Sequence, residues 1–312
     1  MKPAGRAVVF AYHDVGARCL SMLLAHDVDV ALVVTHRDDP DENIFFDSVA
    51  GLAGLAGIPV VMPDDPKAPA LLDRLLAIAP DWLFSFYYRR LLGQAILDTP
   101  RAGAFNLHGS LLPKYRGRVP INWAVLHGES ETGATLHRME LKPDAGALVS
   151  QRRVPILPND TAYRVFGKVV VAAELALEHA LPGILRGDIE ETPLDLSAGS
   201  YFGGRRPEDG RISWHNGAWS IHNLIRAVAP PYPGAFCDVS GDAGEQRLQL
   251  LGSYYRGEPA RGDRARIYWE RGRCHADCVD GERLLLTSLA LDGVLLDEAA
   301  FRARFGEEIP FN

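Results

Sequence analysis

The chain has 312 residues, of which 47% are hydrophobic, and this is enough to form two domains with buried cores. Its formal net charge of −7 argues against a protein whose main partner is nucleic acid, because such proteins carry an excess of positive charge. No stretch reaches the ~18–20 consecutive apolar residues of a membrane span, and the N-terminus does not resemble a signal peptide. We therefore expect a cytoplasmic protein without membrane insertion.

The first part of the chain alternates short apolar runs with segments of helical periodicity. The runs predict strands over 6–12, 28–35, 58–62, 81–86 and 103–107, with helices between them over 16–26, 45–56, 70–79 and 91–97. This alternation is typical of an α/β fold in which a Rossmann-like parallel sheet carries helices on both faces. Ligands bind at the carboxyl ends of the strands in such sheets, so we expect the site near residues 87–92 and after His108. The chain has no G-x-G-x-x-G motif, and a dinucleotide is not expected.

The following segments complete the first domain and begin a second one. Helical spacing predicts helices over 118–128 and 161–185, and the segments 132–141 and 147–156 are predicted to form an antiparallel pair. The composition then shifts to a Gly-, Ser- and Pro-rich stretch, so we place the domain boundary between residues 200 and 201. Residues 201–312 contain candidate strands at 236–239, 246–251, 265–269 and 283–289 and predict a small β-rich domain.

The four cysteines do not indicate a disulfide framework. Cys274, His275 and Cys278 lie close together, but their spacing matches no zinc pattern and there is no second pair of ligands. The sequence therefore predicts no metal site.

The segment from Phe105 to Gly117 is the main functional signal. Asn106 and His108 lie on one face of an extended segment, and Asp144 lies in a predicted turn downstream. An amide can donate a hydrogen bond to an oxyanion, an imidazole can move protons, and a carboxylate can orient the imidazole. Each residue alone is more often a core asparagine, a satisfied histidine or a turn former. Together they indicate a site for carbonyl transfer.

The consecutive residues Asn106–Gly117 (NLHGSLLPKYRG), with Asp144-Ala-Gly146, resemble the signature of formyltransferases that use 10-formyltetrahydrofolate. The resemblance implies that Asn106, His108 and Asp144 are catalytic and that 10-formyltetrahydrofolate is the co-substrate. It also implies that an OB-like β-barrel follows the catalytic domain. The folate pocket that it implies is lined by Arg90, Leu91, Leu92, Arg118, Glu140, Leu141, Lys142, Pro143 and Asp144.

Three further stretches are similar to the formyltransferase half of ArnA, the bifunctional enzyme that modifies lipid A in polymyxin resistance. They are Val8–Asp14, Phe84–Arg89 and Gly128–Gly133, and the similarity extends from residue 6 to about 236. In ArnA this half formylates the 4-amino group of UDP-4-amino-4-deoxy-L-arabinose, which is therefore the expected acceptor. The dehydrogenase half of ArnA has no counterpart in these 312 residues.

Three residues are candidates for contacts with the sugar nucleotide, namely Arg205, Tyr12 and Trp214. Phe202–Asp209 resembles a segment of sugar-amine formyltransferases that reads Phe-Gly-Arg-Arg, in which Arg205 keeps the second arginine and Gly204 replaces the first. Arginine suits carboxylates and phosphates, although a solvated surface charge is the ordinary alternative. Trp214 could stack on a base or a sugar, and packing between domains is the alternative for this ring.

Other functions remain open at this point. The acceptor could be a dTDP-linked 4-amino-4,6-dideoxy sugar, and methionyl-tRNA formyltransferase and formyltetrahydrofolate hydrolase share the catalytic motif. A folate- or sugar-nucleotide-binding module without catalysis would not need Asn106, His108 and Asp144. The expected partners are the small-molecule substrates, without nucleic acid, and a homo-oligomer is compatible with the sequence.

Overall fold

The computed structural model describes residues 4–241 and 244–311, which form two compact units. The α/β unit comprises Met1–Pro120, Thr132–Val154 and Gly167–Gly203. The β-rich unit comprises Ile121–Glu131, Pro155–Phe166 and Gly204–Asn312. The predicted fold class is confirmed, because the first unit is a Rossmann-like α/β sheet and the second contains a curled antiparallel half-barrel. The domain boundary at 200/201 stays a prediction.

The sheet of the α/β unit has the strand order β3-β2-β1-β4-β5-β7-β8. The first five strands run parallel, as their apolar runs predicted, whereas β7 pairs antiparallel with β5. The bounds are β1 Ala4–Ala11, β2 Val28–Val34, β3 Val60–Val61, β4 Trp82–Phe86, β5 Gly103–His108, β7 Glu131–Arg138 and β8 Leu148–Pro155. A further two-stranded sheet pairs β6 (Arg116–Gly117) with β9 (Tyr201–Phe202).

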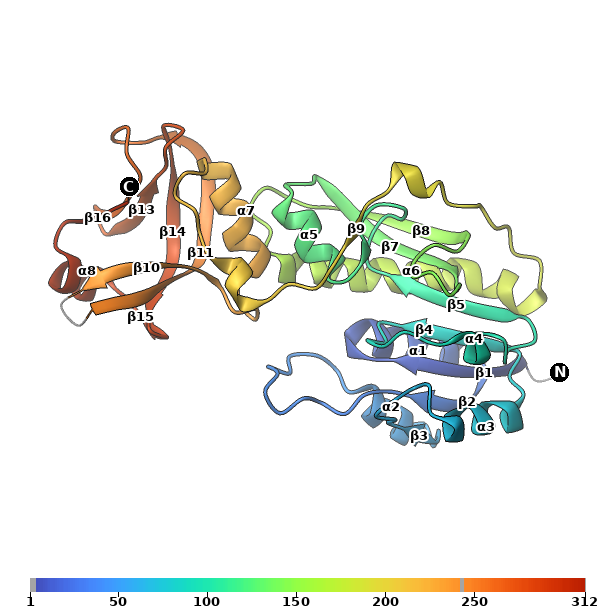
Figure 1. The fold of residues 1–312 in the computed structure, drawn as a ribbon. Coiled ribbons are helices and arrows are strands. Elements are labelled where there is room, and N and C mark those ends of the chain that lie inside the picture. The colour runs from blue at the N-terminus through green and yellow to red at the C-terminus, as the bar shows by residue number, and fades with distance from the viewer. Residues whose placement is uncertain (1–3, 242–243, 312) are drawn as a thin grey trace. The chain divides into compact units, whose positions relative to one another are not determined.

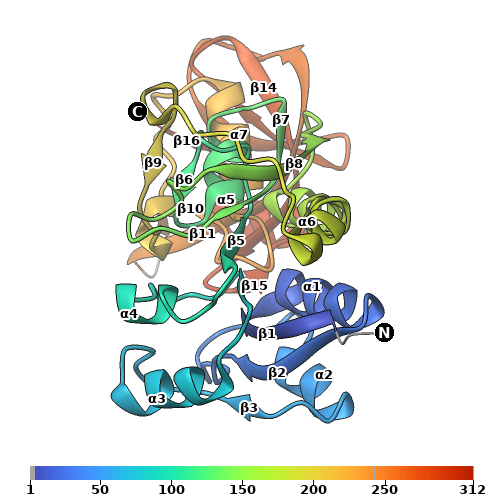
Figure 2. The ribbon, with the colours of Figure 1, turned by 90° about the vertical axis from the view of Figure 1, so that its right-hand side faces the viewer.

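Helices cover both faces of this sheet. Figure 2 shows α1 and α2 on one side of β1 and β2, and α3 and α4 on the other side. The core on the α3 side includes Val8, Phe10, Leu32, Leu71 and Leu75. The bounds are α1 His13–Ala25, α2 Val49–Leu55, α3 Pro69–Ile78, α4 Gln94–Leu97 and α6 Ala162–Arg186, of which α6 begins in the β-rich unit.

The predicted helix over 45–56 is shorter in the structure, because α2 begins only at Val49. Ser48 caps the helix by accepting a hydrogen bond from the Gly51 N–H at 3.1 Å. The rings of Phe45 and Phe46 pack against His13 instead of continuing the helix. Tertiary contacts of two aromatic residues therefore decided this boundary.

The β-rich unit contains an antiparallel sheet with the order β10-β11-β14-β13-β12-β16, and β15 pairs with β14 (Figure 1). Its strands are β10 Ala235–Gly241, β11 Gly244–Pro259, β12 Arg266–Glu270, β13 Arg273–Asp277, β14 Glu282–Leu291, β15 Val294–Leu295 and β16 Glu308–Pro310. Strand β13 was not predicted, because its sequence is largely polar. Its Asp277 is fully buried and accepts hydrogen bonds from Arg266 Nε and the Tyr268 hydroxyl, at 2.9 and 3.0 Å.

Helices α5 (Pro120–Leu126), α7 (Ala218–Val228) and α8 (Glu298–Phe305) complete the β-rich unit. Arg226 of α7 is buried and donates to the Asn223 side chain at 2.8 Å and to the Val125 carbonyl at 3.3 Å. The Asn122 amide donates to the Ala227 carbonyl at 2.7 Å. These bonds fix α5 against α7. The buried polar residues Asn223 and Arg226 of α7 therefore have a structural role. No helix in the described ranges is both long and apolar enough to cross a membrane.

His222 of α7 makes the stability of the protein sensitive to acid. The ring is fully buried, with Nε2 donating to the Pro158 carbonyl at 2.9 Å and Nδ1 2.8 Å from the Ser253 hydroxyl. Burial lowers the pKa of His222 to about 4, helped by the nearby Arg226. In the unfolded chain His222 binds a proton near pH 6.5, and in the folded protein it does so only near pH 4. The contribution of neutral His222 to the free energy of unfolding is therefore complete above pH 6.5 and decreases as the pH falls towards 4.

We expect His222→Gln to remove this part of the pH dependence, which amounts to about 2 kcal/mol between pH 7 and 5. Chemical denaturation at the two pH values measures it. His179→Gln is the matched control, since His179 is exposed. If the His222 variant loses as much stability as the wild type on acidification, His222 is not an acid-sensitive group.

Candidate active site

The end of strand β5 and the turn after β7 bring the three predicted catalytic residues together. Asn106 and His108 are in β5, and Asp144 lies in the turn between β7 and β8 with a φ of 51°. His108 Nδ1 lies 3.5 Å from Asp144 Oδ1, and Asn106 Nδ2 lies at the same distance from that oxygen. The Gly117 N–H donates to Asp144 Oδ2 at 2.9 Å and so holds the carboxylate in place.

The electrostatics of this group favour an ionised Asp144. Burial alone raises the pKa of the Asp144 carboxyl, but the neighbouring imidazoles of His108 and His137 and the Gly117 N–H outweigh burial and hold the pKa well below its usual range. His108 is only 7% exposed, and its Nε2 donates to the Tyr115 carbonyl at 2.7 Å. Both ring nitrogens of His108 therefore face acceptor oxygens.

His137 is part of this group although it was not predicted as a site residue. It is 2% exposed and lies opposite Asn106 in the pairing of β5 with β7. Its Nδ1 donates to the Arg138 carbonyl at 2.6 Å, so its Nε2 accepts from Asn106 Nδ2 at 3.1 Å. In β7, Thr135 lies opposite His108 and His137 lies opposite Asn106. The alternation of these two polar residues along the strand was the sequence signal that could have identified His137 as a site residue.

The residues of the implied folate pocket lie in loops of the α/β unit. Leu92 is buried in the core, so only its backbone could face a ligand, whereas the side chains of Arg90 and Leu91 are exposed. Arg118, Glu140, Leu141 and Lys142 are exposed, and Pro143 and Asp144 are partly buried. These segments follow β4, β6 and β7, of which only β4 is a parallel strand of the main sheet, and their contacts with folate stay a prediction.

Tyr12 and Trp214 are both engaged in packing. Tyr12 is 4% exposed, donates to Asp38 at 2.8 Å and lies under Arg89, whose guanidinium carbon is 4.6 Å from the ring centroid. Trp214 is 7% exposed and stacks on Phe311 with a centroid separation of 4.2 Å. The contacts of Trp214 agree with the packing alternative. The geometry of Tyr12 and Trp214 does not support the predicted contacts of these two rings with the substrate.

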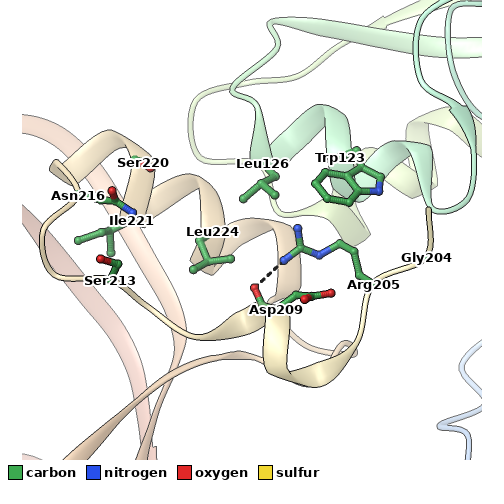
Figure 3. A pocket seen from close by; sticks show the side chains of 10 residues that line it. All are labelled: Trp123, Leu126, Gly204, Arg205, Asp209, Ser213, Asn216, Ser220, Ile221 and Leu224. Carbon is green, nitrogen blue, oxygen red and sulfur yellow. Dashed lines mark hydrogen bonds between the residues drawn. The ribbon is translucent and has the colours of Figure 1, made fainter. Parts of the chain in front are cut away.

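Arg205 lies in a pocket of about 480 Å³ inside the β-rich unit (Figure 3). The pocket is lined by Trp123, Leu126, Gly204, Arg205, Asp209, Ser213, Asn216, Ser220, Ile221 and Leu224. The Arg205 guanidinium carbon lies 4.9 Å from the centroid of Trp123, and Nη2 donates to the Asp209 carbonyl at 2.8 Å. Burial lowers the pKa of Arg205, and its Nε is buried without a hydrogen-bond partner. The pocket thus contains a cation with unused donor capacity.

No cluster of three or more His, Cys, Asp or Glu side chains that could hold a metal occurs in residues 4–241 and 244–311. Cys274 and Cys278 are both buried as free thiols, and burial raises the pKa of each to about 12. Both therefore stay protonated, which makes them poor metal ligands.

Several solved structures resemble this chain in fold. An N-formyltransferase from Helicobacter canadensis, in complex with folinic acid and dTDP-3-aminofucose, has 19% identity and a TM-score of 0.69, with 90% of this chain and 98% of that chain covered. The sugar 3N-formyltransferase WlaRD, studied with dTDP and 5-N-formyl-THF, has 20% identity and a TM-score of 0.71, with coverages of 90% and 97%. HypX from Aquifex aeolicus, in complex with tetrahydrofolic acid, has 17% identity and a TM-score of 0.64, with 96% of this chain but 47% of that chain covered.

Two family models match the chain itself. The formyl transferase model matches residues 17–181, and the model of the formyl transferase C-terminal domain matches residues 205–292. The first match covers more than half of the chain and includes Asn106, His108 and Asp144. The chain therefore belongs to the formyl transferase family, and the protein is a formyltransferase.

Proposed function

We propose that this enzyme transfers the formyl group of 10-formyltetrahydrofolate to the 4-amino group of a nucleotide-linked amino sugar. Our first choice of acceptor is UDP-4-amino-4-deoxy-L-arabinose, which would place the enzyme in lipid A modification. The observation that carries the reaction is the group Asn106, His108 and Asp144, in which Asn106 Nδ2 and His108 Nδ1 each lie 3.5 Å from Asp144 Oδ1. The ArnA-like stretches support the choice of sugar.

Asn106 and His108 supply what the reaction requires. When the neutral amine attacks the formyl carbon, the carbonyl oxygen becomes an oxyanion, to which the Asn106 amide can donate a hydrogen bond. His108, held by Asp144, can give a proton to N10 of the folate as the C–N bond breaks. It can then take the proton that the new amide nitrogen loses. The result is one proton moved from the amine to N10, with His108 restored.

A dTDP-linked amino sugar is the second candidate acceptor. The H. canadensis enzyme was solved with dTDP-3-aminofucose, and WlaRD was solved with dTDP. Both are similar to this chain over nine-tenths of its length, and this favours a nucleotide sugar over a tRNA acceptor. A direct competition between the UDP pentose and the dTDP sugar tests the choice. Faster formylation of the dTDP sugar would reject our acceptor and keep the reaction class.

The hydrolase alternative uses water in place of the amine and could use the same three residues. Product analysis with and without the amino sugar separates the two reactions. We expect tetrahydrofolate to form in step with formylated sugar, and only slowly without the sugar. Equal release of formate in both samples would favour the hydrolase.

Arg205 is our candidate for holding the sugar nucleotide, because its buried Nε lacks an acceptor. We expect Arg205→Ala to raise the KM for the sugar nucleotide by a factor that corresponds to about 1.5–3 kcal/mol, the value of a hydrogen bond to a charged group. The KM for the folate should not change. Arg206→Ala is the matched control, since Arg206 is exposed and does not line the pocket. A parallel rise in the KM for the folate would contradict this assignment.

A further inference from the structure

Arg116 is a second arginine whose Nε lacks a hydrogen-bond partner, and unlike Arg205 the whole residue is buried. It exposes 9% of its surface, and its Nε is buried without a hydrogen-bond partner. Within residues 4–241 and 244–311 no carboxylate lies within ion-pair distance of its guanidinium, and no oxygen accepts a hydrogen bond from it. Its guanidinium carbon lies 6.0 Å from the centroid of the Tyr201 ring. A buried charge without a partner is costly, so this position requires an explanation.

The backbone around Arg116 is held firmly. Its N–H donates to the Ser200 carbonyl at 3.0 Å, and the Arg118 N–H donates to the Phe202 carbonyl at 3.0 Å. Gly117 between them has a φ of 97°, and a Cβ at this position would lie 2.2 Å from the Phe202 carbonyl oxygen. A side chain at residue 117 would therefore push β6 and β9 apart. The fold thus keeps the arginine in this position despite its cost.

Arg116 also lies between two backbone groups that hold the catalytic residues. The carbonyl of Tyr115 accepts the hydrogen bond from His108, and the N–H of Gly117 donates to Asp144. Tyr201, which faces Arg116, is 58% exposed, so one side of this neighbour is open to solvent. The unsatisfied charge is therefore in the same short loop as the contacts that orient His108 and Asp144.

We infer that Arg116, beside Tyr201, forms an anion subsite that binds a phosphate group of the sugar nucleotide. This inference rests on the proposed acceptor class. The planar guanidinium matches a phosphate or a carboxylate by paired hydrogen bonds, and a bound anion would compensate the buried charge. We choose the phosphate because β9 continues after two residues into Arg205, the residue that we assign to the same substrate. A carboxylate of the folate tail has the same chemistry and is the other source to be tested.

Arg116→Met and Arg116→Lys test the subsite through both stability and kinetics. We expect Arg116→Met to raise the KM for the sugar nucleotide about tenfold to hundredfold, while the KM for the folate stays within about twofold. Arg116→Lys should keep part of the affinity for the sugar nucleotide, because lysine retains the positive charge but lacks the paired donors of the guanidinium. Without ligand, the Tm of Arg116→Met should be no lower than that of the wild type, because the change removes an uncompensated charge.

Inorganic pyrophosphate is the probe that does not depend on activity. It should raise the Tm of the wild type by mass action and leave the Tm of Arg116→Met unchanged. Arg101→Met is the matched control, since Arg101 is an exposed arginine of the same unit and pairs with Asp81. This variant should respond to pyrophosphate as the wild type does.

Three outcomes would overturn the inference. A large fall in the Tm of ligand-free Arg116→Met would show that Arg116 stabilises the fold and does not serve as an anion subsite. A rise in the KM for the folate alone would assign the anion to the folate tail. An equal pyrophosphate response in the wild type and Arg116→Met would exclude a phosphate subsite. If the UDP pentose is not formylated but Arg116→Met still loses the pyrophosphate response, the subsite stands and the proposed acceptor fails.

Discussion

Asn106→Ala and His108→Ala are each expected to lower kcat by about 10²–10³ or more while the protein remains folded and binds folate. The amide is the donor that we place at the oxyanion, and loss of one such donor typically has this effect. His108 carries the proton in our mechanism, and its loss leaves Asp144 without its imidazole partner. Steady-state kinetics with saturating sugar and folate, together with a folate-binding measurement, separate catalysis from binding.

The matched controls for these variants are Asn43→Ala and His179→Ala, because both side chains are exposed and lie outside the group. They should keep normal turnover. A folded Asn106 or His108 variant with near-normal kcat would remove that residue from the mechanism. An equal loss of folate affinity would instead indicate a binding role.

Asp144→Asn is expected to lower turnover. The asparagine keeps an acceptor for the Gly117 N–H but removes the negative charge beside His108. Without the carboxylate, His108 is no longer held by a charged partner, so its proton transfer should be slower. A folded Asp144→Asn variant with near-normal kcat would show that Asp144 acts only as a turn residue.

The same substitution also predicts a pH-dependent change in stability. The pKa of Asp144 is held below its usual value in the folded protein, so its contribution is complete above the pKa of the unfolded chain, near pH 4, and disappears as the pH falls further. The difference in unfolding free energy between Asp144→Asn and the wild type should therefore be largest at neutral pH and decrease in acid. Denaturation at pH 7 and pH 3 measures this trend. Asp41→Asn, at an exposed aspartate, is the control.

Most strands of the α/β unit could be predicted from the sequence. Buried parallel strands require continuous apolar runs, and β1, β2, β4 and β5 follow the predicted runs within one or two residues. Strand β13 could not be predicted in this way, because Asp277 is buried only where Arg266 and Tyr268 satisfy it. The start of α2 likewise depends on where Phe45 and Phe46 pack.

The residues of the candidate active site divide in a similar way. Asn106, His108 and Asp144 were identifiable because the residues around the first two form one consecutive motif, and Asp144 lies at the spacing found in the family. His137 could not be identified in this way, because it contacts Asn106 only as a result of the register of β7 against β5. The sequence also could not predict that the Tyr115 carbonyl accepts a hydrogen bond from His108, because every residue has a backbone carbonyl.

The sequence by itself determined the fold class, the formyltransferase family and the identity of the three residues that we place in catalysis. It could do so because apolar periodicity and consecutive motifs are local properties of a chain. Only the tertiary structure decided which partners these residues have, that Arg116 is buried without a counterion, and that Trp214 stacks on Phe311. Burial and hydrogen bonding depend on atoms brought together from distant parts of the chain, so a single residue's environment cannot be read from its neighbours in sequence.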